Sequence, residues 1–290
     1  MSLIDTTLLV PEHISCRELA DNYPALTLSN KHGTATITLH GAHVTDYIPA
    51  GQKPVLFTSK SAIYKEGKAI RGGVPICWPW FNAHPTDDTL PSHGYARAQF
   101  WALISSSHSD DSTSVTLEFS IEKLRAEVTI TLSQKLDIAL TSTNISNESQ
   151  TVGGALHTYF QVSNISSTTL SGLDNVSFIN TVGGANTSEK QSGDITITEE
   201  IDRIYENTGA TVHIFDAEWN RDIAVQKSGS LSTVVWNPWI EKSKGMADLG
   251  NEDYHHFVCI ESANARENVY QLTPGETHTL STSITSLPRA

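Results

Sequence analysis

The chain has little that would cross-link it covalently or hold it in a membrane. Its three cysteines, Cys16, Cys77 and Cys259, are odd in number and far apart among 290 residues, so they predict neither a disulfide framework nor a paired-cysteine metal site. No stretch approaches the ~18 consecutive apolar residues of a membrane helix. The first residues lack the basic start and apolar core of a secretory signal. We therefore expect reduced thiols, a cytoplasmic location and no membrane partner.

Positive charge is also scarce, and this bears on the ligand. There are 19 Lys+Arg against 32 Asp+Glu, and the formal net charge is -13. Binding to a nucleic-acid backbone needs a broad basic surface, so we expect no nucleic-acid partner. A small phosphorylated ligand stays open, because a few convergent arginines can hold one phosphate through short, bidentate hydrogen bonds. Arginines that cluster in such a chain are therefore informative.

Familiar signatures of nucleotide, serine-nucleophile and metal sites are missing. The chain has no GxGxxG after a predicted strand, no Walker loop, no GxSxG and no HExxH. The adjacent His255 and His256 would face opposite ways in a strand and would make a poor chelate. We expect no metal.

Alternation of apolar with polar residues is the dominant pattern, and it predicts strands with one buried face. Residues 34–39 (TATITL) would bury Ala35, Ile37 and Leu39. Three successive strands with short turns, which indicate an antiparallel meander, are predicted from the inward residues Val115, Leu117, Phe119, Ile121, Ala126, Val128, Ile130, Leu132, Leu136, Ile138 and Leu140. Further strands are predicted at residues 44–48, 102–106, 154–160, 194–197, 211–215, 223–226, 234–236, 257–261 and 278–284.

Helical patterns are almost missing. No window of ten or more residues has helical apolar spacing, and residues 59–65 offer a turn or two at most. Strands recur about every ten residues without a linker, as in all-β domains. The sequence therefore predicts an all-β fold, one domain over residues 1–290 built from two large antiparallel sheets packed face to face. A closed barrel is the alternative, because alternation does not distinguish open from closed sheets.

The stretch from residue 70 to residue 97 departs from this pattern. It holds two of the six tryptophans, four prolines and both arginines found between Arg17 and Arg125. Each proline lacks a backbone donor and restricts the residue before it, so no regular helix or central strand fits. A structured loop of this length inside a compact domain is usually functional. We interpret the stretch as the wall of a binding site.

Two residues could carry acid–base chemistry. In the predicted strand 154–160, His157 would share a face with Ala155 and Tyr159 and would look toward solvent or a cleft, although a purely structural histidine also fits. Glu261 ends an almost wholly apolar strand, where partial burial would raise its pKa toward that of a usable base. The alternative for Glu261 is a solvated strand end. Together the two residues would supply an acid–base pair with distinct roles.

Other residues could recognise a ligand. Arg71 precedes two glycines, His93 opens the segment HGYAR and Arg97 closes it, and each arginine could instead belong to a solvated face. Asp202 could accept sugar hydroxyl groups or form an ordinary surface pair. Four tryptophans could stack on a sugar or pack in the core: Trp78, Trp80, Trp236 and Trp239.

Six segments occur in order over most of the chain: IRGGVPICWPWF, HGYAR, ALHTYF, DRIY, VVWNPW and FVCIESA. Together they resemble the hexose-6-phosphate mutarotases, or glucose-6-phosphate 1-epimerases, of the aldose 1-epimerase superfamily. The resemblance implies a galactose-mutarotase-like supersandwich and a cofactor-independent interconversion of the α and β anomers of hexose 6-phosphates. It also implies that His157 is the general acid and Glu261 the general base. The residues implied to line the sugar-phosphate site are Arg71, His93, Arg97 and Asp202.

The chain departs from that family in two places. Many relatives have an insertion with a Trp-Pro pair where this chain turns tightly through Glu122, Lys123 and Leu124, and some have Gln where Ser92 precedes the HG pair. Both differences bear on the rim of the pocket and on the preferred hexose. Two alternatives to the implied activity stay open, namely an epimerase of unphosphorylated aldoses and a non-catalytic sugar-phosphate-binding protein of the same fold.

Overall fold

The computed structural model describes residues 3–289, and antiparallel strands dominate it. A four-stranded sheet contains, in order, β1 (Ile14–Ala20), β2 (Tyr23–Asn30), β3 (Gly33–Thr38) and β4 (His43–Pro49). A nine-stranded sheet contains, in order, β16 (Ile195–Thr196), β13 (Thr168–Ser171), β18 (Val212–Asp216), β19 (Arg221–Ser228), β23 (Thr277–Pro288), β9 (Leu136–Asn144), β8 (Leu124–Leu132), β7 (Ser112–Ser120) and β6 (Ala102–Ser109).

An eight-stranded sheet supplies the strands that matter most below. Its order is β15 (Thr187–Lys190), β14 (Ser177–Asn180), β17 (Ile201–Tyr205), β20 (Ser232–Asn237), β21 (Phe257–Asn264), β11 (Gly154–Leu156) and β5 (Ile76–Cys77), and β12 (Tyr159–Gln161) also pairs with β21. A separate pair joins β10 (Gln150–Val152) to β22 (Tyr270–Leu272).

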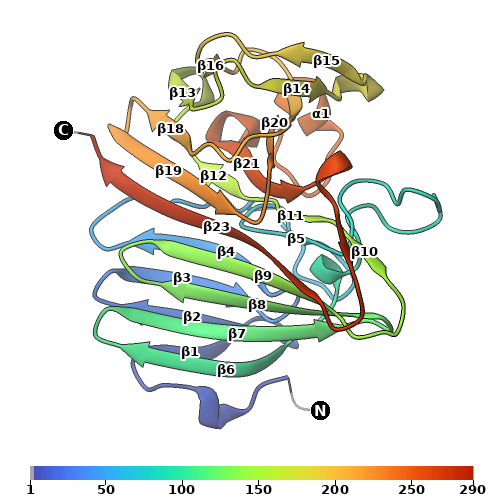
Figure 1. Cartoon of the computed structure of the whole chain (residues 1–290). Coiled ribbons are helices and arrows are strands. Elements are labelled where there is room, and N and C mark those ends of the chain that lie inside the picture. The colour runs from blue at the N-terminus through green and yellow to red at the C-terminus, as the bar shows by residue number, and fades with distance from the viewer. Residues whose placement is uncertain (1–2, 290) are drawn as a thin grey trace.

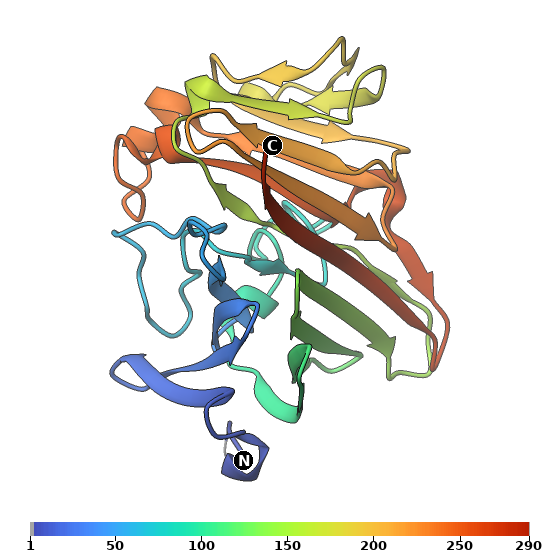
Figure 2. The ribbon, with the colours of Figure 1, turned by 90° about the vertical axis from the view of Figure 1, so that its left-hand side faces the viewer.

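The nine-stranded sheet is a wall that the two other large sheets share (Figure 1). The four-stranded sheet packs on one part of it, where β2 contacts β7 and β8. The eight-stranded sheet packs on another part, where β21 and β11 contact β23. Figure 2 shows the blue strands of the four-stranded sheet as a layer beside the green strands of the nine-stranded sheet. The expected supersandwich is confirmed, but three large sheets build it in the described part of the chain, so the prediction of two sheets is wrong; alternation marks strands and does not say how they group. Each of these three sheets is open, so the barrel alternative is wrong as well.

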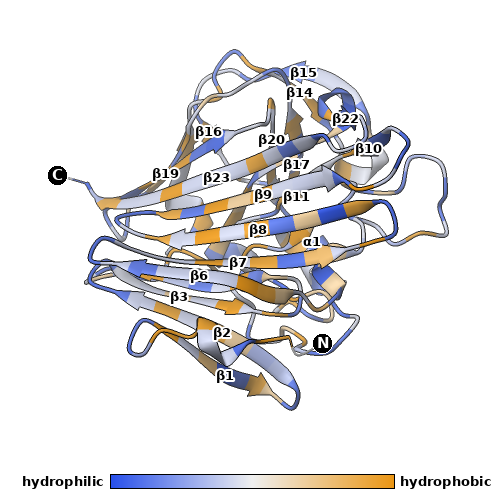
Figure 3. Cartoon of the chain, turned by 60° about the horizontal axis from the view of Figure 1, so that its bottom comes forward, coloured by the Kyte–Doolittle hydropathy of each residue, from blue (hydrophilic) through white to orange (hydrophobic). Residues whose placement is uncertain are grey.

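The predicted meander is confirmed, and it explains much of the core. β7 pairs with β8 and β8 with β9 in unbroken antiparallel register, and apolar and polar residues alternate along these strands in Figure 3. All the predicted inward residues are buried except Phe119 and Ile121. These two are partly exposed, because β7 ends at Ser120 and the chain there reaches the rim of the sheet.

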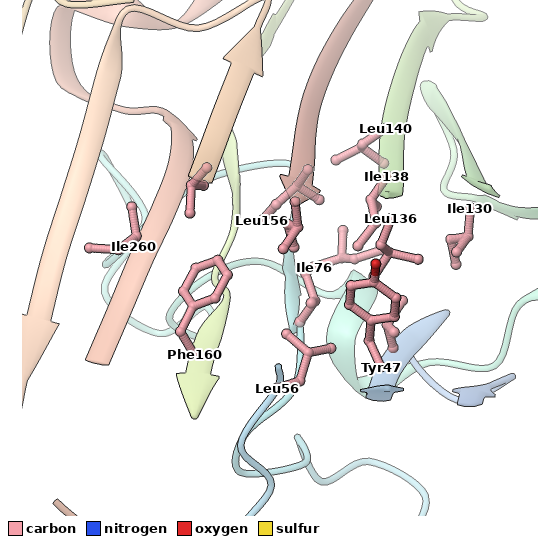
Figure 4. Close-up of a cluster of buried hydrophobic side chains, with 14 of the residues drawn as sticks. Tyr47, Leu56, Ile76, Ile130, Leu136, Ile138, Leu140, Leu156, Phe160 and Ile260 are labelled. Carbon is pink, nitrogen blue, oxygen red and sulfur yellow. The ribbon is translucent and has the colours of Figure 1, made fainter. Parts of the chain in front are cut away.

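Side chains from all three large sheets meet in one apolar core (Figure 4). The cluster drawn there includes Tyr47, Leu56, Ile76, Ile130, Leu136, Ile138, Leu140, Leu156, Phe160 and Ile260, each at most 2% exposed. Burying an apolar side chain of this size contributes roughly 1.5–3 kcal/mol. The sheets are therefore held against one another mainly by apolar burial.

The strand predicted at residues 154–160 is wrong in one respect, because it is broken in the middle. β11 ends at Leu156 and β12 begins at Tyr159. Between them the His157 N–H donates to the Pro75 carbonyl at 3.0 Å, and the Thr158 N–H donates to the Leu156 carbonyl at 2.9 Å. These two bonds take the backbone out of the ladder at His157. The other predicted strands form, although the one at 194–197 shortens to β16.

Helical structure is as limited as expected, but its position differs from the prediction. The α-helix of the described chain is α1 (Trp239–Lys244), six residues long, which is too short to show periodicity in the sequence. Residues 59–65 form no helix, because the Ser59 hydroxyl accepts the Ser61 N–H at 3.1 Å and closes a local turn instead. The 3-10 turns are η1 (Thr6–Leu8), η2 (Ala96–Ala98), η3 (Ile165–Ser167), η4 (Val182–Gly184), η5 (Asp253–His256) and η6 (Arg266–Asn268).

The proline-rich stretch is a loop with one short strand, β5, at the edge of the eight-stranded sheet. An edge position suits a segment whose prolines lack backbone donors. Among residues 3–289 no helix is long and apolar enough to cross a membrane. All three cysteines are free thiols; Cys16 is exposed on β1, whereas Cys77 and Cys259 are buried.

Candidate active site

One cavity of about 340 Å³ brings together all six residues predicted for the site. Its lining consists of Arg71, Phe81, Asn82, Ser92, His93, Arg97, His157, Asp202, Val234, Trp236, Lys242 and Glu261. The loop of residues 70–97 forms one wall, and β17, β20, β21 and the β11–β12 break form the other. The interpretation of that loop as a wall of the site agrees with this geometry.

His157 and Glu261 face each other across two neighbouring strands. The register pairs Leu156 with Ser262 on one side of the strand break and Tyr159 with Cys259 on the other, which places His157 opposite Glu261. The His157 Nε2 atom lies 3.4 Å from Glu261 Oε1, and the two side chains are 12% and 1% exposed. Within residues 3–289, Oε2 of Glu261 and Nδ1 of His157 have no hydrogen-bond partner.

Burial shifts the pKa values of this pair in opposite directions. It raises the pKa of Glu261 well above its usual value, with a further increase from the Asp202 carboxylate and a partial offset from Arg97. It lowers the pKa of His157 well below its usual value, and His93, Arg97 and Arg71 lower it further. Burial thus favours the protonated form of the Glu261 carboxyl group and the neutral form of the His157 imidazole.

Aromatic rings fix the His157 imidazole from three sides. Its ring stacks on Tyr159, with centroids 5.1 Å apart and planes 11° from parallel. The rings of Trp236 and His93 meet it edge-on, each with a centroid separation of 5.9 Å. The strand break turns the side chain into the cavity, and these contacts limit its rotation once there.

Arg71 is held by two partners inside the protein. Its Nε donates to Asp248 Oδ1 at 3.2 Å and its Nη2 pairs with Oδ2 at 3.2 Å, while Nη1 donates to the Tyr159 hydroxyl at 2.9 Å. Burial alone would lower the pKa of Arg71, but Tyr159 and Asp248 outweigh it and the net shift is upward. Gly72 follows Arg71 with φ 109°, and a Cβ there would lie 2.4 Å from the Thr58 Cα. The glycine permits the close backbone contact that places Arg71.

Arg97 differs from Arg71 in its hydrogen-bond partner, which is a backbone carbonyl and not a carboxylate. It lies in η2, where its Nη2 donates to the Ser92 carbonyl at 2.9 Å. In the described chain it makes no ion pair with a carboxylate, and its charge lowers the pKa of both His157 and His93. Arg97 is therefore the arginine in this cavity whose charge is left for a ligand.

His93 is a fixed neutral donor. Its backbone adopts φ 66°, and it is tied to Asn82 twice: the His93 N–H donates to the Asn82 carbonyl at 2.8 Å, and the Asn82 N–H donates to His93 Nδ1 at 3.3 Å. Burial, with help from Arg97 and Arg71, lowers the pKa of His93 to about 3. Because Nδ1 is an acceptor in a neutral ring, the proton resides on Nε2.

Asp202 completes the predicted set, and beside it lies a lysine that the sequence did not reveal. Asp202 sits on β17 opposite Trp236 on β20, and burial raises its pKa. Lys242, on α1, lines the same cavity and pairs with Glu200 at 2.7 Å. Its position depends on the short helix after the WNPW segment. The only hint in the sequence was that Lys242 lies three residues after the WNPW segment.

The other lining residues that the sequence did not mark are Phe81, Asn82 and Val234, and the tryptophans divide between the cavity and the core. Trp236 lines the cavity, whereas Trp78 is fully buried and Trp239 packs against the core. Trp80 lines a larger neighbouring groove of about 960 Å³, which shares Phe81 and Asn82 with the cavity. The tight turn at residues 122–124 lines this groove and lies outside the cavity. Ser92, the other departure from the family, lies in the cavity itself.

Metal ligands do not gather in this region. Among residues 3–289 no group of three or more His, Cys, Asp and Glu side chains is arranged to hold a metal ion. The arrangement described above offers instead an enclosed acid–base pair, an uncompensated guanidinium, a neutral imidazole donor and a carboxylate acceptor. These groups suit a polyhydroxylated ligand that exchanges protons.

Comparison with known proteins agrees with this picture. The sequence model described as Aldose 1-epimerase matches residues 24–285. The chain is 36% identical over 264 residues to a protein of Escherichia coli (strain K12) named "Putative glucose-6-phosphate 1-epimerase", covering 87% of this chain and 86% of that one. A protein of the same name from Cenchrus ciliaris is 31% identical over 265 residues, covering 83% of this chain and 78% of that one.

Solved structures lead to the same family. A crystal structure from Salmonella typhimurium, described as a "putative mutarotase (YeaD)", superimposes with a TM-score of 0.89 at 32% identity and covers 97% of this chain and 95% of that one. The motifs, the fold and these similarities agree over most of the chain. The protein belongs to the aldose 1-epimerase family.

Proposed function

We propose that the protein interconverts the α and β anomers of hexose 6-phosphates, with glucose 6-phosphate as the first substrate to test. The observation that carries the proposal is the enclosed pair formed by His157 Nε2 and Glu261 Oε1 at 3.4 Å. Support for a phosphorylated sugar comes from Arg97, whose charge is uncompensated in the cavity, and from the names of the E. coli and Cenchrus relatives.

The reaction proceeds from the ionised form of the pair, with Glu261 as carboxylate and His157 as imidazolium; burial disfavours this form, and the attraction between the two charges 3.4 Å apart favours it. Glu261 takes the proton of the anomeric hydroxyl, the C1–O5 bond breaks, and His157 gives its proton to the ring oxygen. The products are an aldehyde at C1, a hydroxyl at C5, a protonated Glu261 and a neutral His157. Burial favours these two neutral side chains, which offsets part of the cost of opening the ring.

Rotation about the C1–C2 bond then exposes the other face of the aldehyde. The C5 hydroxyl attacks that face, His157 takes back its proton, and Glu261 returns a proton to the new anomeric oxygen. The second half reverses the first, so the pair ends as it began and no cofactor takes part.

The remaining residues hold the substrate. Arg97 binds the phosphate, with Arg71 adding positive charge nearby. The Nε2–H of His93 donates to a sugar oxygen, and Asp202 accepts from sugar hydroxyls. Since His93 is fixed to Asn82 and neutral over the working pH range, it orients the ring without competing for the proton in transit.

Polarimetry or exchange NMR on freshly dissolved α-glucose 6-phosphate tests the proposal. We expect acceleration over the spontaneous rate, and a higher kcat/KM for glucose 6-phosphate than for glucose. Faster turnover of glucose would assign the protein to unphosphorylated aldoses. Tight binding of glucose 6-phosphate without any acceleration would make it a sugar-phosphate-binding protein and would overturn the catalytic role.

A further inference from the structure

Asp248 is not among the residues that line the substrate cavity, but it makes a two-point ion pair with Arg71, which does line it. Both contacts measure 3.2 Å, and the side chains are 25% exposed for Arg71 and 22% for Asp248. A fork of this kind fixes the guanidinium plane as well as its position. The next residue, Leu249, is buried among Phe57, Tyr159, Trp236 and Phe257, so the segment that carries Asp248 is anchored to the same aromatic cluster.

The pair also controls charge. The two arginines of the cavity differ, because Asp248 compensates Arg71 whereas Arg97 has no carboxylate partner in the described chain. Attraction for a phosphate falls when a carboxylate lies against the cation that would attract it. A phosphate entering the cavity therefore meets Arg97 without a direct carboxylate partner and Arg71 with its charge partly neutralised by Asp248.

A second contact links Arg71 to the acid–base pair. The remaining nitrogen, Nη1, donates to the Tyr159 hydroxyl at 2.9 Å, and the Tyr159 ring stacks on His157 with planes 11° from parallel. Asp248, Arg71, Tyr159 and His157 thus form a continuous chain of contacts. Each of the three Arg71 nitrogens is assigned to a protein partner, two to Asp248 and one to Tyr159.

We propose that Asp248 is a positioning and specificity-determining residue. In the positioning half of the proposal, it orients Arg71 so that Arg71 holds Tyr159 against His157. In the charge half, it partly neutralises Arg71, so that phosphate recognition depends mainly on Arg97. The positioning half of this proposal depends on the acid–base role proposed for His157. The charge half does not, because it concerns binding alone.

Asp248→Asn separates the two halves, since it keeps the size of the side chain and removes its charge. Calorimetric titration with inorganic phosphate should give about fivefold tighter binding than the wild type, because Arg71 becomes an uncompensated cation. Turnover of glucose 6-phosphate should fall roughly tenfold, because the neutral amide holds the guanidinium less firmly and Tyr159 and His157 lose their alignment. A lower KM together with a lower kcat is not expected from a loss of folded protein.

The matched control is Glu241→Gln, which removes the same charge from α1. Glu241 is 85% exposed and pairs only with Lys244 in the described chain, so phosphate binding and turnover should both stay within about twofold of the wild type. Asp248→Glu restores the charge with a longer side chain. It should return the phosphate affinity to the wild-type value while restoring turnover only in part.

A second variant serves if Asp248→Asn does not fold. Tyr159→Phe keeps the ring on His157 but removes the hydroxyl that Arg71 binds, so phosphate binding should not change while turnover falls. Unchanged or weaker phosphate binding in Asp248→Asn would overturn the charge half. Undiminished turnover in both variants would overturn the positioning half. A wild-type protein that binds phosphate but does not accelerate mutarotation would contradict the proposed function and leave the charge half to stand on the titrations.

Discussion

His157 lies opposite Glu261 at a break in the strand that carries it, with Nε2 and Oε1 3.4 Å apart. An unbroken ladder on both sides of the break keeps the two strands in register, so the distance between the two groups is set by sheet geometry. The break frees the histidine backbone to bond Pro75 and lets its side chain turn into the cavity. A rigid sheet and one irregular point together place the proton donor and acceptor.

Replacing the carboxyl group of Glu261 should remove catalysis without unfolding the protein. In Glu261→Gln the side chain keeps a similar shape, but the amide carries no charge and cannot take the anomeric proton, so kcat should fall by roughly 10²–10⁴. Exchange NMR on glucose 6-phosphate measures this, with Glu241→Gln as the control. Retention of full activity in Glu261→Gln would rule out the proposed base.

Removing the charge of Arg97 should affect phosphorylated substrates selectively. For Arg97→Gln we expect KM for glucose 6-phosphate to rise roughly tenfold or more, because the uncompensated guanidinium of the cavity is lost. Activity on glucose should change much less. Arg125→Gln is the matched control, since Arg125 is a surface residue of β8 paired with Glu118 and Glu127. Equal losses on glucose and glucose 6-phosphate would show that Arg97 does not read the phosphate.

His43 should make the protein sensitive to acid. It is buried, its Nε2–H donates to the Gly72 carbonyl at 2.7 Å, and burial lowers its pKa from 6.5 to about 3. The unfolded chain therefore binds a proton at this residue between pH 6.5 and about 3, where the folded chain does not. The contribution of His43 to the free energy of unfolding is therefore complete above pH 6.5. It is lost as the pH falls from 6.5 toward about 3, by on the order of a few kcal/mol.

Urea unfolding at several pH values checks this expectation. His43→Gln keeps a donor for Gly72 but cannot titrate, so its free energy of unfolding should fall less than that of the wild type between pH 6.5 and 4. Comparing the two proteins cancels the contributions of other groups, including the opposite one from Glu261. Parallel curves for the two proteins would show that His43 does not titrate as described.

Gly94 should tolerate no side chain. Its φ is 72°, and a Cβ would lie 2.0 Å from the Trp78 carbonyl oxygen, which is backbone and cannot move aside. Gly94→Ala should lose about 3 kcal/mol or more of the free energy of unfolding, measured in urea. Gly51→Ala is the control, because its φ of 73° is similar but nothing lies within 4 Å, so only about 1 kcal/mol of backbone strain is expected. Similar losses at the two positions would contradict the steric explanation.

Local patterns in the sequence were enough to predict many of the strands but not how they group into sheets. The alternation from Val115 to Leu140 predicts three strands because its period matches the pleat, and the structure pairs them as expected. β1 and β2 were not predicted, because most of β1 is exposed on both faces and β2 contains Pro24 near its start. The single-domain organisation stays a prediction.

The six main residues of the candidate site could be predicted from the sequence, but the contacts between them and their neighbours could not. His157 and Glu261 were marked by their positions in apolar strands, and the motif order grouped them with Arg71 and Arg97. The pairing of Arg71 with Asp248 joins residues 177 positions apart, and no local pattern announces it. Lys242 was missed for a related reason, since a six-residue helix sets its direction. The roles of these residues stay proposals until the variants are measured.

The three free cysteines have a practical consequence for such measurements. Burial raises the pKa of the Cys77 thiol to about 12 and raises that of Cys259 as well, so both are shielded from alkylation in the folded protein. Cys16, exposed on β1 of the four-stranded sheet, is the accessible thiol of residues 3–289. A maleimide dye should therefore attach at that one position on the native chain, giving a reporter on a different sheet from the acid–base pair without any engineered cysteine.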